Sequence, residues 1–207
     1  HEPEYYHVEV RARDDRAVAV LPEATFDDMT VETTAFADGA NTAPEGDYRF
    51  GLVVRREGRN YYAFAISPRT QMWYVLKSTP SSTTVLDTGS SASILQDTTA
   101  NKLRVDAKGA KLDFYINDEP VSSVEDGDYS QGATGFYVET LDSPRAHIHF
   151  DDILVENYKG PDQVLAADDF RDPESGWPNA LVFDNYYMGY HEPEYYHVEV
   201  RARDDRA

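Results

Sequence analysis

Two histidines alternate on one short segment, His147-Ile148-His149, and together they could bind a transition-metal ion. In an extended strand, residues two apart point to the same face, and imidazole is a ligand for zinc, copper and nickel. A metal site needs further ligands, and no other residue stands at an obvious spacing. The remaining histidines, at positions 1, 7, 191 and 197, lie near the chain ends. The pattern therefore favours surface histidines among many acids.

Two acidic segments carry oxygen ligands that a calcium ion would accept. In the first, Asp126, Asp128 and Ser130 alternate as the ligands at the start of a calcium loop do. The EF-hand pattern then fails, because Gln131 stands where its glycine should be and Tyr137 where its glutamate should be. We therefore interpret this segment as a turn between two strands of the back sheet and keep calcium as the alternative. The second segment offers Asp168, Asp169, Asp172 and Glu174.

Paired carboxylates, which glycoside hydrolysis requires, do not stand out in this sequence. Glu9 lies in Val8-Glu9-Val10 before Arg11, a pattern typical of a solvated strand face. Asp151-Asp152 follows a strand, where such a pair ends strand pairing or caps a turn. The chain has no Gly-x-Ser-x-Gly elbow and no phosphate-binding loop. We therefore predict no catalytic residue and no cofactor other than calcium.

Adjacent aromatic residues recur along the chain. Because neighbouring residues of a strand face opposite ways, one member of each pair should enter the core and the other should face outward. Outward rings either contact another domain or stack on sugars, while core filling is the simplest role. The pairs are Tyr61-Tyr62, Trp73-Tyr74, Tyr186-Tyr187 and Tyr195-Tyr196. The residues that we predict for an interface are Phe170, Trp177, Phe183, Tyr186, Tyr187, Tyr195 and Tyr196.

Strands must position these residues, because alternating apolar and polar residues dominate and no segment keeps a helical period. Turn residues separate the strands at Glu57–Asn60, Lys108–Ala110 and Asn117–Glu119. This spacing predicts an all-β fold, a two-sheet antiparallel β-sandwich or jelly roll. The predicted strands are Tyr5–Ala12, Met29–Phe36, Tyr48–Arg55, Tyr61–Ser67, Met72–Ser78, Thr84–Asp87, Lys102–Ala107, Lys111–Ile116, Ala133–Glu139 and Ala146–Val155.

Seventeen residues at the start of the chain recur at its end. His1–Ala17 and His191–Ala207 are identical, with an offset of 190 residues. A tandem array with this period, or a duplication of this piece, would produce such an identity. We therefore expect residues 1–160 to form a jelly-roll domain without its opening strand. Residues 161–207 would be a linker followed by the opening segment of the next repeat.

Four segments follow the order of one known type of domain when the chain is read from Asp168 through His191 and on through Val18 to Val155. DDFRDPESGW (168–177) is typical of a domain start, GLVVRREGRNYYAFAISP (51–68) of a central hairpin, residues 101–140 of back-sheet hairpins and RAHIHFDDILV (145–155) of a last strand. In this combination the chain resembles the concanavalin-A-like, laminin-G-like jelly-roll domains grouped with the 3-keto-disaccharide hydrolase family. Such domains often occur in large bacterial extracellular proteins. The resemblance implies the fold, whereas one fold hosts many activities.

The resemblance also leaves two differences to explain. The opening block stands last in this chain, so the chain is out of register with the domain boundary. Bacterial laminarinases of the same fold carry a strand motif Glu-x-Asp-x-x-Glu, and this sequence lacks it.

Charge and composition narrow the range of partners. The formal net charge is −19, and such a surface repels nucleic acid and anionic membranes. No apolar run is long enough to span a bilayer, so we expect no membrane insertion. The chain has no cysteine, so its stability must come from β structure without disulfides. We expect an extracellular or cell-surface location.

The repeat and the acidic surface together favour a structural role, as a repeat of an extracellular filament. Copies of the chain would join by strand completion, in which main-chain hydrogen bonds saturate a sheet edge. Asp168–Ala207 would donate, and strands near Tyr5–Ala12 and Ala146–Val155 would receive. A carbohydrate-binding module is the alternative, and it requires an exposed aromatic row near Asn, Asp and Arg. A glycoside-hydrolase-type enzyme is the second alternative, and it requires a pocket with paired acids or a metal.

Overall fold

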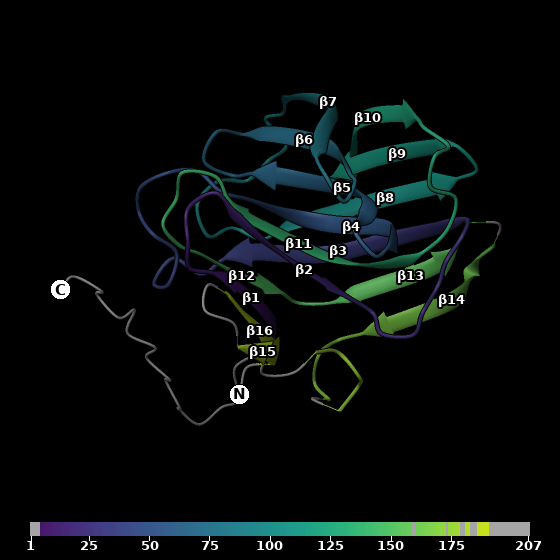
Figure 1. The fold of residues 1–207 in the computed structure, drawn as a ribbon. Coiled ribbons are helices and arrows are strands. Elements are labelled where there is room, and N and C mark those ends of the chain that lie inside the picture. Colours follow the sequence, from purple (N-terminus) through teal and green to yellow (C-terminus); the bar gives the residue numbers. More distant parts are fainter. Residues whose placement is uncertain (1–4, 159, 173, 179–180, 183–185, 191–207) are drawn as a thin grey trace.

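Alternating burial along the strands organises the chain into two antiparallel sheets (Figure 1). The computed structural model describes residues 5–158, 160–172, 174–178, 181–182 and 186–190. Strand β3 (Met29–Ala37) shows the pattern, because every second residue from Met29 onward is buried and those between are half-buried. That period of two places one row of side chains in the core and the other on the outer face. Across these residues, no helix is long and apolar enough to cross a membrane.

The first sheet has ten strands, in the order β10-β9-β8-β3-β12-β1-β16-β15, with β13 and β14 branching from β3. Its strands are β1 (Tyr6–Val10), β3, β8 (Asn101–Lys108), β9 (Lys111–Ile116), β10 (Glu119–Glu125), β12 (Ala146–Phe150), β13 (Ile153–Asn157), β14 (Gly160–Asp168), β15 (Leu181–Val182) and β16 (Tyr186–Tyr190). The second sheet has six strands, in the order β2-β11-β4-β5-β6-β7. They are β2 (Asp15–Val20), β4 (Arg49–Glu57), β5 (Asn60–Ser67), β6 (Met72–Ser78), β7 (Thr83–Ser90) and β11 (Ala133–Thr140). The all-β sandwich predicted from the sequence is confirmed.

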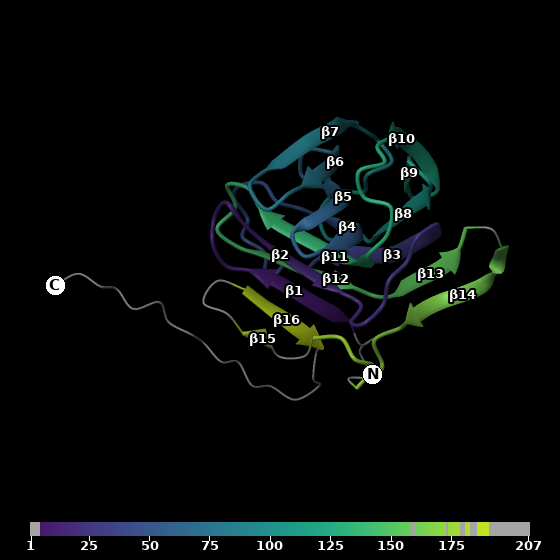
Figure 2. The ribbon, with the colours of Figure 1, turned by 45° about the vertical axis from the view of Figure 1, so that its right-hand side comes forward.

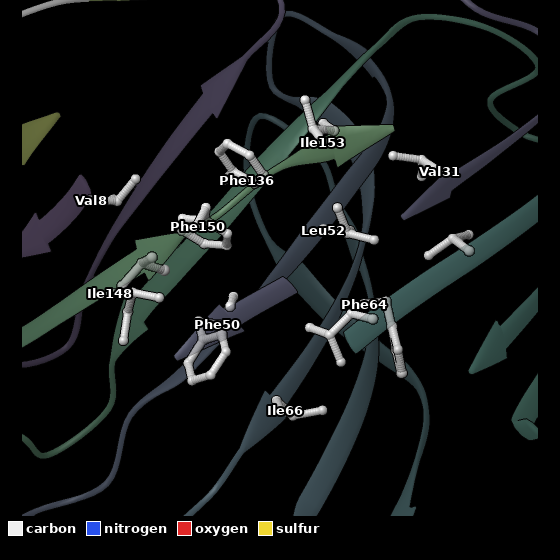
Figure 3. Close-up of a cluster of buried hydrophobic side chains, with 14 of the residues drawn as sticks. Val8, Val31, Phe50, Leu52, Phe64, Ile66, Phe136, Ile148, Phe150 and Ile153 are labelled. Carbon is white, nitrogen blue, oxygen red and sulfur yellow. The ribbon is translucent and has the colours of Figure 1, made fainter. Parts of the chain in front are cut away.

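The inner faces of the two sheets enclose one large apolar core (Figure 3). Phe136 from the six-stranded sheet stacks on Phe150 from the ten-stranded sheet, with ring centroids 4.0 Å apart and planes 17° apart. Phe64 also packs on Phe114 across the two sheets, with centroids 5.0 Å apart and planes tilted by 38°. Aromatic rings from both sheets thus interdigitate, and their burial is the main stabilising contribution to such a sandwich.

The C-terminal block, as far as residues 160–190 are described, packs on the sandwich formed by the preceding residues. This corrects the prediction that it opens the next repeat. Residues 163–168 of β14 continue the sheet beside β13, and β16 pairs with β1 (Figure 2). Phe170 and Trp177, predicted to contact a neighbouring repeat, are buried against Tyr6 and Phe136. The linker predicted to begin at residue 161 instead starts within strand β14. In this chain the opening block therefore completes its own sandwich rather than a separate domain.

The other residues predicted for an interface divide into two groups. Tyr187 is half-buried in β16, and Tyr186 belongs to the same strand. Phe183, Tyr195 and Tyr196 lie outside the described residues, as does the duplicated segment 191–207. An interface made by these residues stays a prediction.

The predicted strand at 146–155 is in fact two strands. Asp151 and Asp152 separate β12 from β13, and both strands pair with β3. The amide of Thr34 donates to the Asp152 carboxylate over 2.8 Å, and the amide of Asp151 donates to the Thr34 carbonyl over 2.9 Å. These two acids therefore end one stretch of pairing and start another, which confirms their predicted structural role.

Replacing Trp177 by alanine tests whether the C-terminal block belongs to this core. Trp177 is 3% exposed, and its ring lies 4.9 Å from Phe136 and 5.1 Å from Tyr6. We expect Trp177→Ala to lower the free energy of unfolding by about 3–5 kcal/mol, measured by urea denaturation. Val164→Ala is the control, because Val164 is 54% exposed in the same segment and should change stability by less than about 0.5 kcal/mol. Equal effects of the two substitutions would contradict this packing.

Candidate functional site

A polar recess opens where the β4–β5 hairpin meets the loop between β10 and β11. Its volume is about 320 Å³. The hairpin supplies Arg55, Glu57 and Asn60, and the loop supplies Asp128, Tyr129, Ser130 and Gln131. Because β10 belongs to one sheet and β11 to the other, this loop crosses between the sheets at one end of the sandwich. It is therefore a connection between sheets, and the prediction of a turn within the back sheet is wrong.

A β-bulge in β4 turns Arg55 into the end of the sandwich. The pairing register between β4 and β5 shifts between Val54 and Glu57, and Arg55 has a φ of +55°. Arg55 is completely buried as a result. Its Nη1 donates to the carbonyl of Gly109 over 2.6 Å and to that of Tyr129 over 3.0 Å. The guanidinium thus ties the turn between β8 and β9 to the loop that lines the recess.

Gly132 allows the loop to approach this bulge closely. A Cβ atom at Gly132 would lie 2.5 Å from the backbone carbon of Arg55 and 2.6 Å from the amide nitrogen of Arg56. Such distances are too short for any side chain. Gly132 also has a φ of +149°, which L side chains rarely adopt. The recess therefore depends on glycine where the loop enters β11.

Two donors of Arg55 remain unpaired within the described part of the chain. Its Nε and Nη2 are buried and make no hydrogen bond there. The nearest carboxylate oxygen, Oδ1 of Asp28, lies 3.8 Å from Nη2, beyond hydrogen-bond distance. Burial lowers the pKa of Arg55, although the charge of Asp28 opposes this effect. Buried N–H groups almost always have partners, so unpaired ones beside a recess mark a place for a ligand with oxygen acceptors.

A hydrogen-bond network holds the base of the loop. The Tyr62 hydroxyl donates to Asp126 over 2.5 Å, and the amide of Tyr129 donates to that hydroxyl over 3.2 Å. Burial raises the pKa of Tyr62 to about 12, and the bond to Asp126 adds to the shift. Burial alone would raise the pKa of Asp126, but hydrogen bonds from Lys77 and Tyr62 outweigh it and hold the pKa below its usual range. Asp126 is therefore ionised at neutral pH and anchors the loop.

Lys77 lies between the two acids that the sequence offered for calcium. Its Nζ is 2.6 Å from the Asp126 carboxylate and 2.5 Å from the Asp128 carboxylate. An ammonium group thus supplies the positive charge at this point. In the second acidic segment, the carboxylates of Asp168, Asp169 and Asp172 accept from the backbone amides of Phe170, Arg171 and Glu174, respectively. Calcium binding by these acids stays a prediction.

The outer face of the six-stranded sheet carries a second polar and aromatic cluster. Glu139 lies between Arg16 and Arg49 on neighbouring strands, and Nε of Arg49 is 2.5 Å from its carboxylate. Tyr137 donates to Glu139 over 2.7 Å, and Tyr61 and Tyr137 are both buried under these side chains. Arg16 also donates to the Thr83 hydroxyl on the opposite edge strand. The charged side chains of this face pair with one another and cover Tyr61 and Tyr137, so these two rings form no exposed aromatic row.

Glu9 lies in a buried ion cluster, which corrects its prediction as a solvated residue. Glu9 is 2% exposed, and its carboxylate forms ion pairs with Arg11 and Arg145. Nη2 of Arg11 lies 2.5 Å from that carboxylate. Burial would raise the pKa of Glu9, but the hydrogen bond from Arg11 and the charges of His147 and Arg145 hold it below the usual value. His147 and His149 lie beside this cluster with His7, a partner that sequence spacing did not reveal.

Comparisons with known proteins show which solved structures have a similar fold. No family model matches the chain, and no curated protein matches it. A carbohydrate-binding module, CBM66 of Bacillus subtilis, superposes with a TM-score of 0.55 at 19% identity, over 69% of this chain and 81% of that one. The GH43 protein BlXynB of Bacillus licheniformis gives 0.56 at 14%, over 73% and 32%. This chain has a jelly-roll fold of the concanavalin-A-like type.

A third jelly-roll match is the β-fructofuranosidase of Aspergillus kawachii, with a TM-score of 0.51 at 11% identity, over 77% of this chain and 28% of that one. The chain thus spans about a third of the length of the GH43 protein and of the β-fructofuranosidase, and most of the length of the binding module. At these identities the likeness concerns the fold.

The loop network predicts a specific dependence of stability on pH. Because the folded-state pKa of Asp126 is lowered, its contribution is present above its unfolded pKa and is lost as pH falls through the folded pKa. We expect Asp126→Asn to lower the free energy of unfolding by about 1 kcal/mol at pH 7, and the difference from the unsubstituted chain to shrink below about pH 4. Urea denaturation across this range measures it. Glu45→Gln, at an exposed acid, is the control, and a difference that stays constant with pH would count against the network.

Proposed function

We propose that this chain is a carbohydrate-binding module and that the polar recess is its sugar site. The observation that carries the proposal is a recess of about 320 Å³ with the buried guanidinium of Arg55 beside it, whose Nε and Nη2 make no hydrogen bond within the described residues. Sugar hydroxyls are the acceptors that fit such donors without adding a charge. The volume lies at the lower end of the range for small-ligand sites, which suits one or two sugar rings.

The other residues of the recess complement a polyhydroxylated ligand. Glu57 and Asp128 offer carboxylate oxygens that accept from sugar hydroxyls, and the Asn60 amide both donates and accepts. The Tyr129 ring is half-buried at the same recess and packs on Tyr62 with centroids 4.9 Å apart. One cation and two acids in the recess, on a chain of net charge −19, favour neutral sugars over acidic ones.

The comparisons support this class of ligand. The three similar structures are named a carbohydrate-binding module, a GH43 protein and a β-fructofuranosidase. The proposal is that this chain binds a glycan without cleaving it, in the manner of the first. It also locates the chain outside the cell or at its surface, where polysaccharides are met.

Substitutions in the hairpin test the sugar site. The unsubstituted chain is first screened on an array of neutral oligosaccharides, and the best ligand is then titrated by calorimetry. We expect Glu57→Gln combined with Asn60→Ala to weaken binding about 10-fold or more, because two hydrogen-bonding groups of the recess are lost. Both residues are strand ends beside the β4–β5 turn and lie outside the core, so the fold should persist.

Glu119→Gln is the matched control, because Glu119 is an exposed acid that does not line the recess. Its affinity should equal that of the unsubstituted chain. The proposal fails when no glycan binds, or when the hairpin variant binds as tightly as the control. Release of sugar from the bound glycan would replace the binding role with a hydrolytic one.

Assembly into a filament is a second candidate function, supported by the duplicated segment. Strand β1 lies between β12 and β16, and Tyr6, Val8 and Val10 are fully buried. Residues 196–200 have the same sequence as β1, so a second copy of the chain carries the residues to occupy this position. Electron microscopy of the chain and of a variant ending at residue 190 tests this. Regular assemblies that disappear on truncation support strand exchange, and isolated particles from both contradict it.

A further inference from the structure

We infer that His7, His147 and His149 form a binding site for a divalent transition-metal ion, with Zn²⁺ as the expected ligand. The site lies on the outer face of the ten-stranded sheet, and it is independent of the proposed sugar site. Three imidazoles from two adjacent strands supply the nitrogen donors that zinc sites with three protein ligands use.

Strand register brings the three side chains together. Strands β1 and β12 pair in the ten-stranded sheet (Figure 2), and in this antiparallel pair His7 lies directly opposite His149, which is two residues from His147. The inner positions of these strands are core residues, among them Tyr6, Val8 and Ile148. The alternating positions therefore place all three histidines on the outer face.

The donor atoms are close enough to share one ion. One ring nitrogen from each histidine lies within 4.8 Å of the others. Nδ1 of His7 is 2.6 Å from Nε2 of His147, and the ring centroids of His7 and His149 are 4.1 Å apart. Bonds of about 2.0–2.1 Å to zinc in a tetrahedral site require donors about 3.3 Å apart. Small rotations of the rings reach that spacing without movement of the strands.

The side chains around the three histidines favour a metal-binding role over a role as separate surface residues. Tyr5 and Phe36 pack on His149, with ring centroids 5.2 Å and 5.0 Å away. Oδ2 of Asp38 lies 3.9 Å from Nε2 of His149, where a carboxylate can orient the imidazole or complete the coordination. Nδ1 of His147 is buried and makes no hydrogen bond within the described residues.

Metal titration of the full chain, prepared without a histidine tag and freed of metal by a chelator, tests the site. We expect one Zn²⁺ per chain by calorimetry, with a Kd below about 10 μM. Saturation should raise the Tm by about 5–10 °C, because the ion links β1 to β12 only in the folded chain. Co²⁺ should give the intense visible absorption of a tetrahedral site. The absence of Zn²⁺ binding to the unsubstituted chain would overturn the inference.

Asparagine substitutions locate the ligands. We expect His7→Asn and His149→Asn each to weaken Zn²⁺ binding at least about 100-fold and to abolish the Co²⁺ absorption. His197→Asn is the matched control, because residues 191–207 repeat residues 1–17 around it, and it should bind as the unsubstituted chain does. Circular dichroism of each variant checks the fold. Where a variant at position 7 or 149 does not fold, His147→Gln replaces it, with the same expected loss. Unchanged binding in these variants, or an equal loss in the control, refutes the assignment.

Discussion

The packing of Tyr6 against Phe136, Phe170 and Trp177 is the contact on which the rest of the structure depends. Their rings come from β1, β11 and the C-terminal block, and the centroids of Tyr6 lie 5.1–5.8 Å from the other three. This cluster joins β1 and the segment from Phe170 to Trp177 to one core. It also fixes the orientation of β1, because burying Tyr6 inward forces His7 and Glu9 outward. The histidine cluster and the buried ion cluster of Glu9 are thus consequences of the same packing.

Alternating apolar residues made most of the sandwich predictable, and a weak apolar signal explains why β10 and β14 were missed. β3 alternates along its whole length, and its prediction needed no tertiary information. β10, with the sequence EPVSSVE, is an edge strand whose residues are half-buried or exposed, so it carries little apolar signal. β14 also lies at an edge of the sheet. Edge strands exist because a neighbour offers hydrogen bonds, and that neighbour is not visible in the local sequence.

The candidate sites depend on contacts that no local pattern encodes. The loop from Asp126 to Gly132 was recognisable as unusual, yet its acids bind Lys77, a residue about fifty positions earlier. The inward turn of Arg55 follows from a bulge and from the space left by Gly132. His7 meets His149 through strand register across most of the chain. Residue types therefore indicated candidate chemistry, whereas topology decided which residues share a site.

The distribution of charge connects the two proposed sites. The chain has 19 basic residues and 38 acidic ones. Several of the basic side chains form buried or half-buried contacts within the fold. Arg55 closes one end of the sandwich, Arg49 neutralises Glu139, and Lys77 joins two acids of the loop. The solvent-facing surface is left with an excess of carboxylates, and its field repels anions and attracts cations. Such a surface would favour neutral sugars over acidic ones at the proposed sugar site and would attract metal ions to the chain as a whole. One electrostatic bias thus favours both ligands while the sites themselves lie on different parts of the fold.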